Sequence, residues 1–115
     1  MRILVVTQYD DAVGPIVAAF LRDYSTRLEA VSVGKKPAQT LHPLVVETMK
    51  ECLVDLEGYE PKDVSEVDER QFDLIIEWPE TPLPSDLDAF RVVRDNIKNE
   101  SFLYYRDVLR KRYSI

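Results

Sequence analysis

The sequence predicts an α/β protein with a three-layer open parallel sheet of three or four strands flanked by helices. Three short aliphatic runs, too short for core helices, alternate along the chain with stretches in which apolar residues recur at helical spacing. Strands that alternate with helices imply right-handed crossovers and therefore parallel strands. With 115 residues, of which 45% are hydrophobic, the chain is long enough for one core and too short for two. We therefore expect a single domain over residues 1–115.

The prediction of a ligand site rests on residues 2–21, which are expected to form the first strand, a loop and the first helix. Residues 3–6 form an uninterrupted run rich in β-branched side chains, which is typical of a buried parallel strand. Gly14 and Pro15 suit the start of a helix, and a dense apolar face follows them. The loop after the first strand of an open parallel sheet borders the usual ligand crevice, and the next helix points its partly positive end at that loop. We therefore expect a ligand loop that consists of Thr7, Gln8, Tyr9, Asp10, Asp11, Ala12, Val13 and Gly14.

The middle of the chain continues the alternation. The first helix is predicted to end near residues 24–27, and residues 28–33 alternate as a second strand that Gly34 closes. Pro43 begins a second helix, which Gly58 ends. Its core face is predicted from apolar residues at helical spacing, namely Val45, Met49, Cys52, Leu53 and Leu56.

The last third of the chain contains one more strand and a long helix. A short helix over residues 65–70, capped by Ser65, precedes a third strand at residues 72–76. A stiff connection then contains Pro79, Pro82 and Pro84. Ser85 is predicted to cap the long C-terminal helix, whose periodicity is reset at Asn99, where a C-terminal helical extension begins.

The extension carries apolar or aromatic groups all round one helical turn: Phe102, Leu103, Tyr104 and Tyr105. One face of a small domain cannot bury all of them. Two interpretations stay open. Either this surface pairs with a second copy in a homodimer, or the segment bends back and covers an edge or face of the sheet.

Composition excludes several classes of function. The net charge of -6 argues against general nucleic-acid binding, which needs a basic surface. The lone cysteine, Cys52, excludes an intramolecular disulfide and a multi-cysteine zinc site, and its place in the second helix favours a small buried hydrophobe over a reactive thiol. No apolar run approaches the roughly 20 residues of a membrane span, and no signal pattern is present. We therefore expect a cytoplasmic protein that binds neither nucleic acid nor membrane.

Several segments occur in an order that is typical of one family: VGKKPAQTLHPLVVETMKE, LEGYEPKDV, FDLII and FRVVRDNI. They include His42-Pro43 before the second helix, Gly58 after it, Pro61-Lys62 next, and Arg94-Asp95 in the last helix. In these residues, and over most of its length, the chain resembles the low-molecular-weight protein tyrosine phosphatases, a family that includes the thioredoxin-coupled arsenate reductases. The resemblance implies their α/β fold.

The residues that carry this family's chemistry are replaced. In the family, the loop after the first strand reads Cys, five residues, Arg and Ser-Pro; the thiolate attacks phosphorus or arsenic, and the Arg grips the oxyanion. Alignment of Gly14 and Pro15 with Ser-Pro places Thr7 at the cysteine and Val13 at the arginine. The chain has no Asp-Pro pair to supply the family's general acid, and it lacks the further cysteines of an arsenate reductase. The segment before the last helix is also shorter than the family pattern, which leaves a fourth strand open. No catalytic residues are therefore expected.

Two hypotheses of function follow. The first is a catalytically inactive, phosphatase-like binding or regulatory module without a cofactor, whose partner is a protein or a non-anionic small ligand. In that case Asp10 or Asp11 accepts the amides at the start of the first helix, where a phosphate would lie. The alternative is a weak phosphatase, an arsenate-reductase-like enzyme or a metal-dependent enzyme that uses the acidic loop; a Mg²⁺ ion would then be held by Asp10, Asp11 and Glu77. His42, the one histidine, is expected at a helix cap or on the surface and not beside Thr7 as a base.

Overall fold

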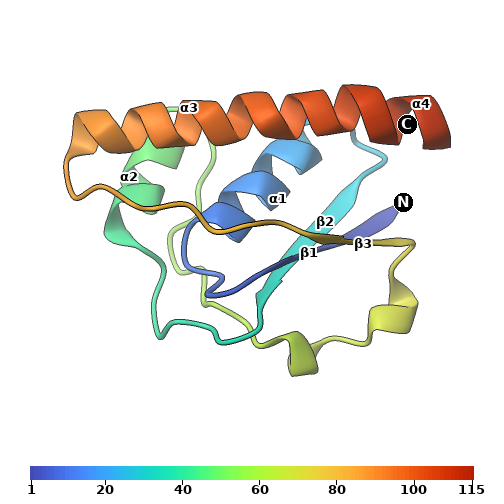
Figure 1. Cartoon of the computed structure of the whole chain (residues 1–115), viewed down its shortest axis with the longest axis horizontal. Helices are drawn as coiled ribbons and strands as arrows, with labels where there is room; N and C mark the ends of the chain where they lie inside the picture. Colours follow the sequence, from blue (N-terminus) through green and yellow to red (C-terminus); the bar gives the residue numbers. More distant parts are fainter.

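The computed structural model describes residues 1–115 and is built on a parallel sheet of three strands in the order β2-β1-β3 (Figure 1). In the central strand β1 (Arg2–Thr7), Ile3 lies opposite Ala30 of β2 (Glu29–Gly34) and opposite Leu74 of β3 (Leu74–Glu77). Residues 3–7 of β1 are buried, because strands flank both of its edges and other layers cover both faces. The predicted fold class is confirmed, with three strands and no fourth.

Alternate side chains of β1 divide the core into two parts. Ile3 and Val5 point to the face that is covered by α1 (Val13–Tyr24), α2 (Pro43–Lys50) and α3 (Leu87–Tyr104), where 20 buried residues form the main core. Leu4 and Val6 point to the other face. That face is covered by the chain around two short 3₁₀ helices, η1 (Val64–Glu66) and η2 (Glu69–Gln71).

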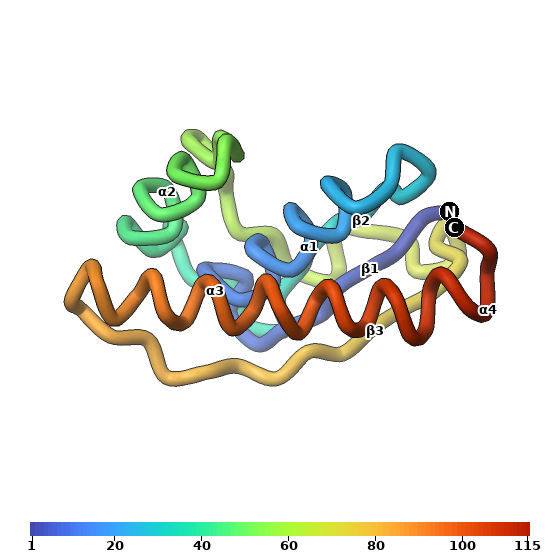
Figure 2. The backbone as a smooth tube through the Cα atoms, turned by 90° about the horizontal axis from the view of Figure 1, so that it is seen from above, coloured from blue at the N-terminus to red at the C-terminus, as the bar shows by residue number.

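Between β3 and α3 the chain runs as an extended strap, residues 78–86, alongside α3 (Figure 2). At its start the amide of Trp78 donates to the carbonyl of Val6 over 2.9 Å, and the indole meets the ring of Tyr104 edge to face. Proline cannot donate to a strand ladder and does not fit a helix interior, so the three prolines keep the strap out of both. The segment in which the sequence allowed a fourth strand therefore forms the strap and not a strand.

Two helix caps lie close to the predicted residues but not on them. Asp86, and not Ser85, caps α3, since its carboxylate accepts the N–H of Ala89 over 2.9 Å. The predicted helix over residues 65–70 is wrong, because the chain there forms two separate 3₁₀ turns. The first turn begins with a capping box between Asp63 and Glu66.

The second helix ends earlier than the sequence predicts. α2 stops at Lys50, and Leu53, which was expected on the core face, is 97% exposed. Leu53 has a φ of 61°, and a non-glycine residue in this left-handed region cannot continue a right-handed helix. Gly58, with a φ of 81°, therefore lies in a separate, later turn.

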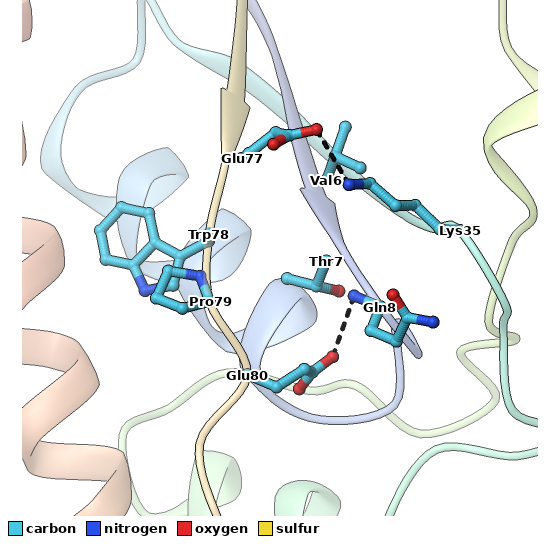
Figure 3. Close-up of a pocket in the computed structure, with 8 residues that line it drawn as sticks. All are labelled: Val6, Thr7, Gln8, Lys35, Glu77, Trp78, Pro79 and Glu80. Carbon is cyan, nitrogen blue, oxygen red and sulfur yellow. Dashed lines mark hydrogen bonds and ion pairs between the residues drawn. The ribbon is translucent and has the colours of Figure 1, made fainter.

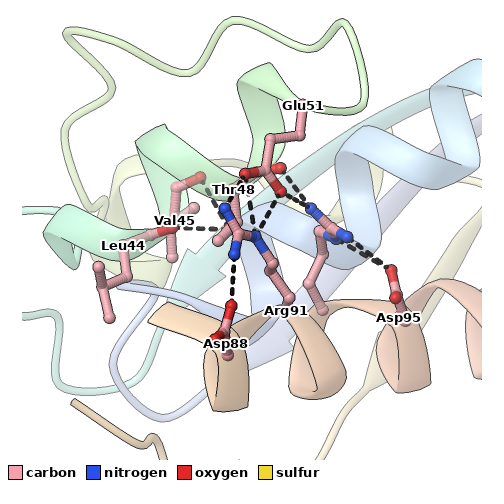
Figure 4. A network of polar contacts seen from close by, with 8 residues as sticks. Leu44, Val45, Thr48, Glu51, Asp88, Arg91 and Asp95 are labelled. Carbon is pink, nitrogen blue, oxygen red and sulfur yellow. Dashed lines mark hydrogen bonds and ion pairs between the residues drawn. The ribbon is translucent and has the colours of Figure 1, made fainter. Parts of the chain in front are cut away.

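An ion-pair network centred on Glu51 fastens the end of α2 to α3 (Figure 4). Arg91 Nη2 lies 2.8 Å from Glu51 Oε2, and Arg94 Nη1 lies 2.6 Å from Glu51 Oε1. The hydrogen bonds from Arg91, and then those from Arg94, lower the pKa of Glu51 to about 2. Arg94 is only 9% exposed and also donates to the carbonyl of Thr48 over 2.8 Å, so its charge is held in a nearly buried place that needs this carboxylate.

The C-terminal helix continues past Asn99 without a reset. Beyond α3 it passes into a π-helical segment, η3 (Tyr105–Arg110), and a last turn, α4 (Lys111–Tyr113). Leu109 is fully buried and Tyr105 packs against Tyr24, so much of the segment covers the domain itself. Phe102 and Leu103 stay 43% and 38% exposed, and pairing with a second copy through them stays a prediction. None of the helices is long and apolar enough to cross a membrane.

Candidate functional site

The loop between β1 and α1 is held close to the sheet by two glycines. A Cβ atom at Gly14 would lie 2.9 Å from Thr7 Oγ1, and one at Gly34 would lie 3.0 Å from the backbone carbon of Tyr9. Neither position has room for a side chain, because Gly34 lies next to the loop backbone and Gly14 lies next to the side chains of Thr7 and Asp10. Val13 is 1% exposed and opens α1, and no side chain caps this helix at Ala12.

Thr7, which the sequence resemblance aligned with the family's nucleophile, is 2% exposed at the end of β1. Its hydroxyl oxygen accepts a hydrogen bond from the amide of Asp10 over 3.3 Å, and no side-chain base is hydrogen-bonded to it. His42 lies elsewhere, at the start of α2, where its Nδ1 accepts the amide of Leu44 over 3.2 Å and its ring stacks on Phe90. The expectation that His42 caps this helix is therefore confirmed, and Thr7 has no partner that could take its proton.

Asp10 does not bond to the amides at the start of α1, although its Oδ1 lies next to Gly14. Its side chain is fully buried, and Oδ2 accepts both the hydroxyl of Tyr59 over 2.6 Å and the amide of Lys62 over 2.9 Å. Oδ1 has no hydrogen-bond partner, and neither has the buried Oδ1 of Asp11. Burial raises the pKa of Asp10, although the bonds from Tyr59 and Lys62 act in the opposite direction. The prediction that Asp10 or Asp11 accepts the helix-start amides is therefore wrong.

The carboxylate that contacts the loop amides comes from the strap instead. Glu80 Oε2 accepts the amide of Gln8 over 3.1 Å and the amide of Tyr9 over 3.0 Å. Figure 3 shows Glu80 turned from the strap towards the loop, while Trp78 and Pro79 lie on the opposite side. Sequence reasoning missed Glu80, and the available signal was an acid held between two prolines of a stiff connection.

Two cavities border the strap. The strand-end cavity, of about 380 Å³, is lined by residues 6–8, Lys35 and residues 77–80 (Figure 3). The strap cavity, of about 270 Å³, lies between the strap and α3 and is lined by Val13, residues 78–82, and four residues of α3, namely Val93, Asn96, Ile97 and Glu100. The predicted ligand loop thus contributes Thr7, Gln8 and Val13 to cavities, whereas Asp10 lines neither.

The three acids of the metal hypothesis are not brought together. Asp10 is bound to Tyr59 and Lys62, whereas Glu77 is exposed and its Oε1 lies 3.0 Å from Lys35 Nζ. No three His, Cys, Asp or Glu side chains are grouped closely enough to hold a metal ion. The arrangement thus offers a carboxylate bound to backbone amides and two cavities with carboxylates in their walls.

Comparisons with known proteins bear on the fold. No family model matches the sequence, and no curated protein matches it significantly. Among solved structures, a low-molecular-weight protein tyrosine phosphatase from T. tengcongensis aligns with a TM-score of 0.79 at 16% identity, over 94% of this chain and 99% of that one. A YwlE arginine phosphatase mutant with a phosphorylated active-site serine aligns with a TM-score of 0.80 at 14% identity, over 97% and 98%. An arsenate reductase from Archaeoglobus fulgidus aligns with a TM-score of 0.75 at 19% identity, over 86% and 94%.

Proposed function

We propose that this chain, which has the fold of low-molecular-weight protein tyrosine phosphatases and arsenate reductases, uses that fold to bind a partner protein or a non-anionic small ligand and does not hydrolyse phosphate esters. One observation carries the proposal: the carboxylate of Glu80 accepts the amides of Gln8 and Tyr9. Backbone amides in a loop before a helix are groups that hold an oxyanion. Here they hold a carboxylate of the chain itself.

The groups for phosphoryl chemistry are missing around that contact. A threonine hydroxyl needs an adjacent base to act as a nucleophile, and Thr7 contacts none. Val13 cannot grip an oxyanion as a guanidinium does. Lys35 is the one cation that lines the strand-end cavity, and it is already paired with Glu77. Cys52, the only cysteine, lies just past the end of α2, so it does not replace the missing nucleophile.

The charges around the loop also oppose an anion. At a separation of about 5 Å and an effective dielectric constant of about 20, one carboxylate repels a singly charged anion by about 3 kcal/mol. The start of a helix attracts an anion by typically less than about 2 kcal/mol. A phosphate that enters next to Glu80 is therefore repelled more than α1 attracts it, and it must displace Glu80 to bind.

A second candidate function is phosphoryl transfer to Thr7 itself. It is favoured by the place of Thr7 in the wall of the strand-end cavity and by the structural neighbour whose active-site serine is phosphorylated. In this step the Thr7 oxygen would attack the phosphorus of an aryl phosphate, the bond to the aryl oxygen would break, and the hydroxyl proton would pass to water. The product would be a phosphothreonine that persists because no arginine or general acid assists its hydrolysis.

One set of assays separates these possibilities. The wild-type protein is incubated with p-nitrophenyl phosphate, and both nitrophenol release and the intact mass are followed. We expect neither turnover nor a gain in mass. Turnover that the isosteric change Thr7→Val abolishes would overturn the proposal, and a mass gain that Thr7→Val abolishes would establish the second candidate.

A gain-of-function series tests the part that Glu80 plays. Thr7→Cys with Val13→Arg restores the nucleophile and the anion clamp, and the same pair is also made together with Glu80→Ala. We expect any recovered turnover to be higher with Glu80→Ala, because the loop amides are then free. Equal turnover in both proteins would mean that the carboxylate does not compete for the anion position.

A further inference from the structure

We infer that the strap cavity binds a small organic cation, with an ammonium or guanidinium group carried on a short apolar body. This inference deepens the proposed function, since it names the chemical class of a non-anionic ligand and a place for it. The cavity measures about 270 Å³, which suits a ligand smaller than most drug-sized molecules.

Part of the cavity wall is apolar. Val13 contributes an alkyl group where the related enzymes would place an arginine, and α3 contributes Val93 and Ile97. The strap contributes Trp78, whose indole lies on the side of the strap away from the loop (Figure 3). These groups favour an apolar body, and the face of an indole also attracts a cation that lies within about 6 Å of it.

The polar groups of the cavity add negative charge and no positive charge. Glu80 and Glu100 line it, together with Asn96, and no lysine, arginine or histidine does. Glu100 forms no ion pair, and the loop amides bind only one of the two carboxylate oxygens of Glu80. Glu100 therefore offers acceptors to a ligand, whereas the carboxylate of Glu80 is turned towards the loop and contributes its charge. A cation is attracted by these charges and an anion is repelled.

The spacing along α3 places these groups on one side of the helix. Val93, Asn96, Ile97 and Glu100 are related by steps of three and four residues, so they form one stripe that faces the strap. The stripe runs from apolar Val93 to charged Glu100. A ligand with an apolar body and one charged end matches this order, whereas a bare metal ion would leave the apolar walls without a partner.

The experiment titrates the full chain with benzylammonium and follows the indole N–H signal of Trp78 by NMR. The chain has one tryptophan, so the signal is unambiguous. Benzyl alcohol and benzoate, at equal ionic strength, are ligands of similar size with no charge and negative charge. We expect saturable shifts with benzylammonium, with a Kd of about 1–10 mM as is typical of so small a ligand, and binding at least about threefold weaker for benzyl alcohol. Equal affinity for the alcohol, or no saturation with benzylammonium by about 50 mM, would overturn the inference.

Two variants test whether the charge that attracts the cation is one that lines the cavity. Glu100→Gln should raise the Kd of benzylammonium by about two- to fivefold, the effect of one exposed ion pair. Glu47→Gln removes the same charge from the exposed side of α2, outside the cavity, and should leave the Kd unchanged. Equal effects of the two changes would mean that the general field of the protein attracts the cation, against the inference. Turnover of aryl phosphate would overturn the proposed function but would leave the measured binding of benzylammonium as it is. Absence of benzylammonium binding, in a protein that shows no turnover, would overturn this inference alone.

Discussion

Replacement of Glu80 by alanine perturbs the contact on which the proposed function rests. The change leaves the amides of Gln8 and Tyr9 without the carboxylate that accepts both of them. Two hydrogen bonds to one charged, half-exposed acceptor are worth about 2–3 kcal/mol together. We therefore expect the free energy that holds the strap against the loop to fall by about this amount. Protection of the two amides against hydrogen exchange, measured by NMR, should then drop roughly 30- to 150-fold.

The neighbouring acid Glu77 gives a matched control. Its side chain is 71% exposed and forms one surface ion pair with Lys35, so Glu77→Ala should cost less than about 1 kcal/mol. It should also leave the exchange of the Gln8 and Tyr9 amides unchanged. Unaltered exchange in Glu80→Ala, or an equal loss of protection in both variants, would refute the reasoning that the strap carboxylate fills the loop.

Three further predictions concern charge burial and assembly. Glu51→Gln should lower the free energy of unfolding at pH values above 4.5. The difference from the wild type should vanish as the pH falls through about 2, because the native pKa of the Glu51 carboxyl is depressed. A loss of stability that persists in acid would contradict this. The free energy of unfolding of Asp10→Asn, measured with urea, should rise relative to that of the wild type as the pH increases above 3.8. The reason is that burial raises the native pKa of Asp10, so the ionised carboxylate of the wild type opposes folding. A stability gain confined to acid pH would contradict this sign. Sedimentation velocity at micromolar concentration tests the homodimer: Phe102→Glu with Leu103→Glu should convert a dimer to a monomer, and a monomeric wild type removes the idea. Truncation is a poorer test because Leu109, further along, is fully buried.

The order of elements could be predicted because local patterns determine it. The aliphatic run of β1, the Gly14-Pro15 start of α1 and the alternation of strands with helices are all short-range signals, and each agrees with the observed element. The predicted cap of α3 was wrong because two residues that can cap a helix are adjacent there. Asp86 lies next to Ser85, and both are good caps, so the sequence does not distinguish them.

The contacts of the candidate site could not be predicted in the same way. Glu80 and Gln8 are 72 positions apart, and Asp10 and Tyr59 are 49 apart. No periodicity relates such pairs, because only the assembled sheet and strap bring them together. That Thr7 and Val13 stand at the positions of the family's nucleophile and anion clamp stays a prediction from the sequence. The sequence did not identify which carboxylate would approach the loop.

The loop after β1 needs glycines beside it for its shape, and this need does not depend on whether the loop is reactive. A side chain at Gly34 is excluded by the backbone of Tyr9 and Asp10, whatever residue stands at position 7 or 13, whereas a side chain at Gly14 would meet the side chains of Thr7 and Asp10. Gly34 should therefore tolerate substitution poorly even if no reaction is catalysed. Folding alone therefore constrains the path of this turn, whether or not the turn supports a reaction.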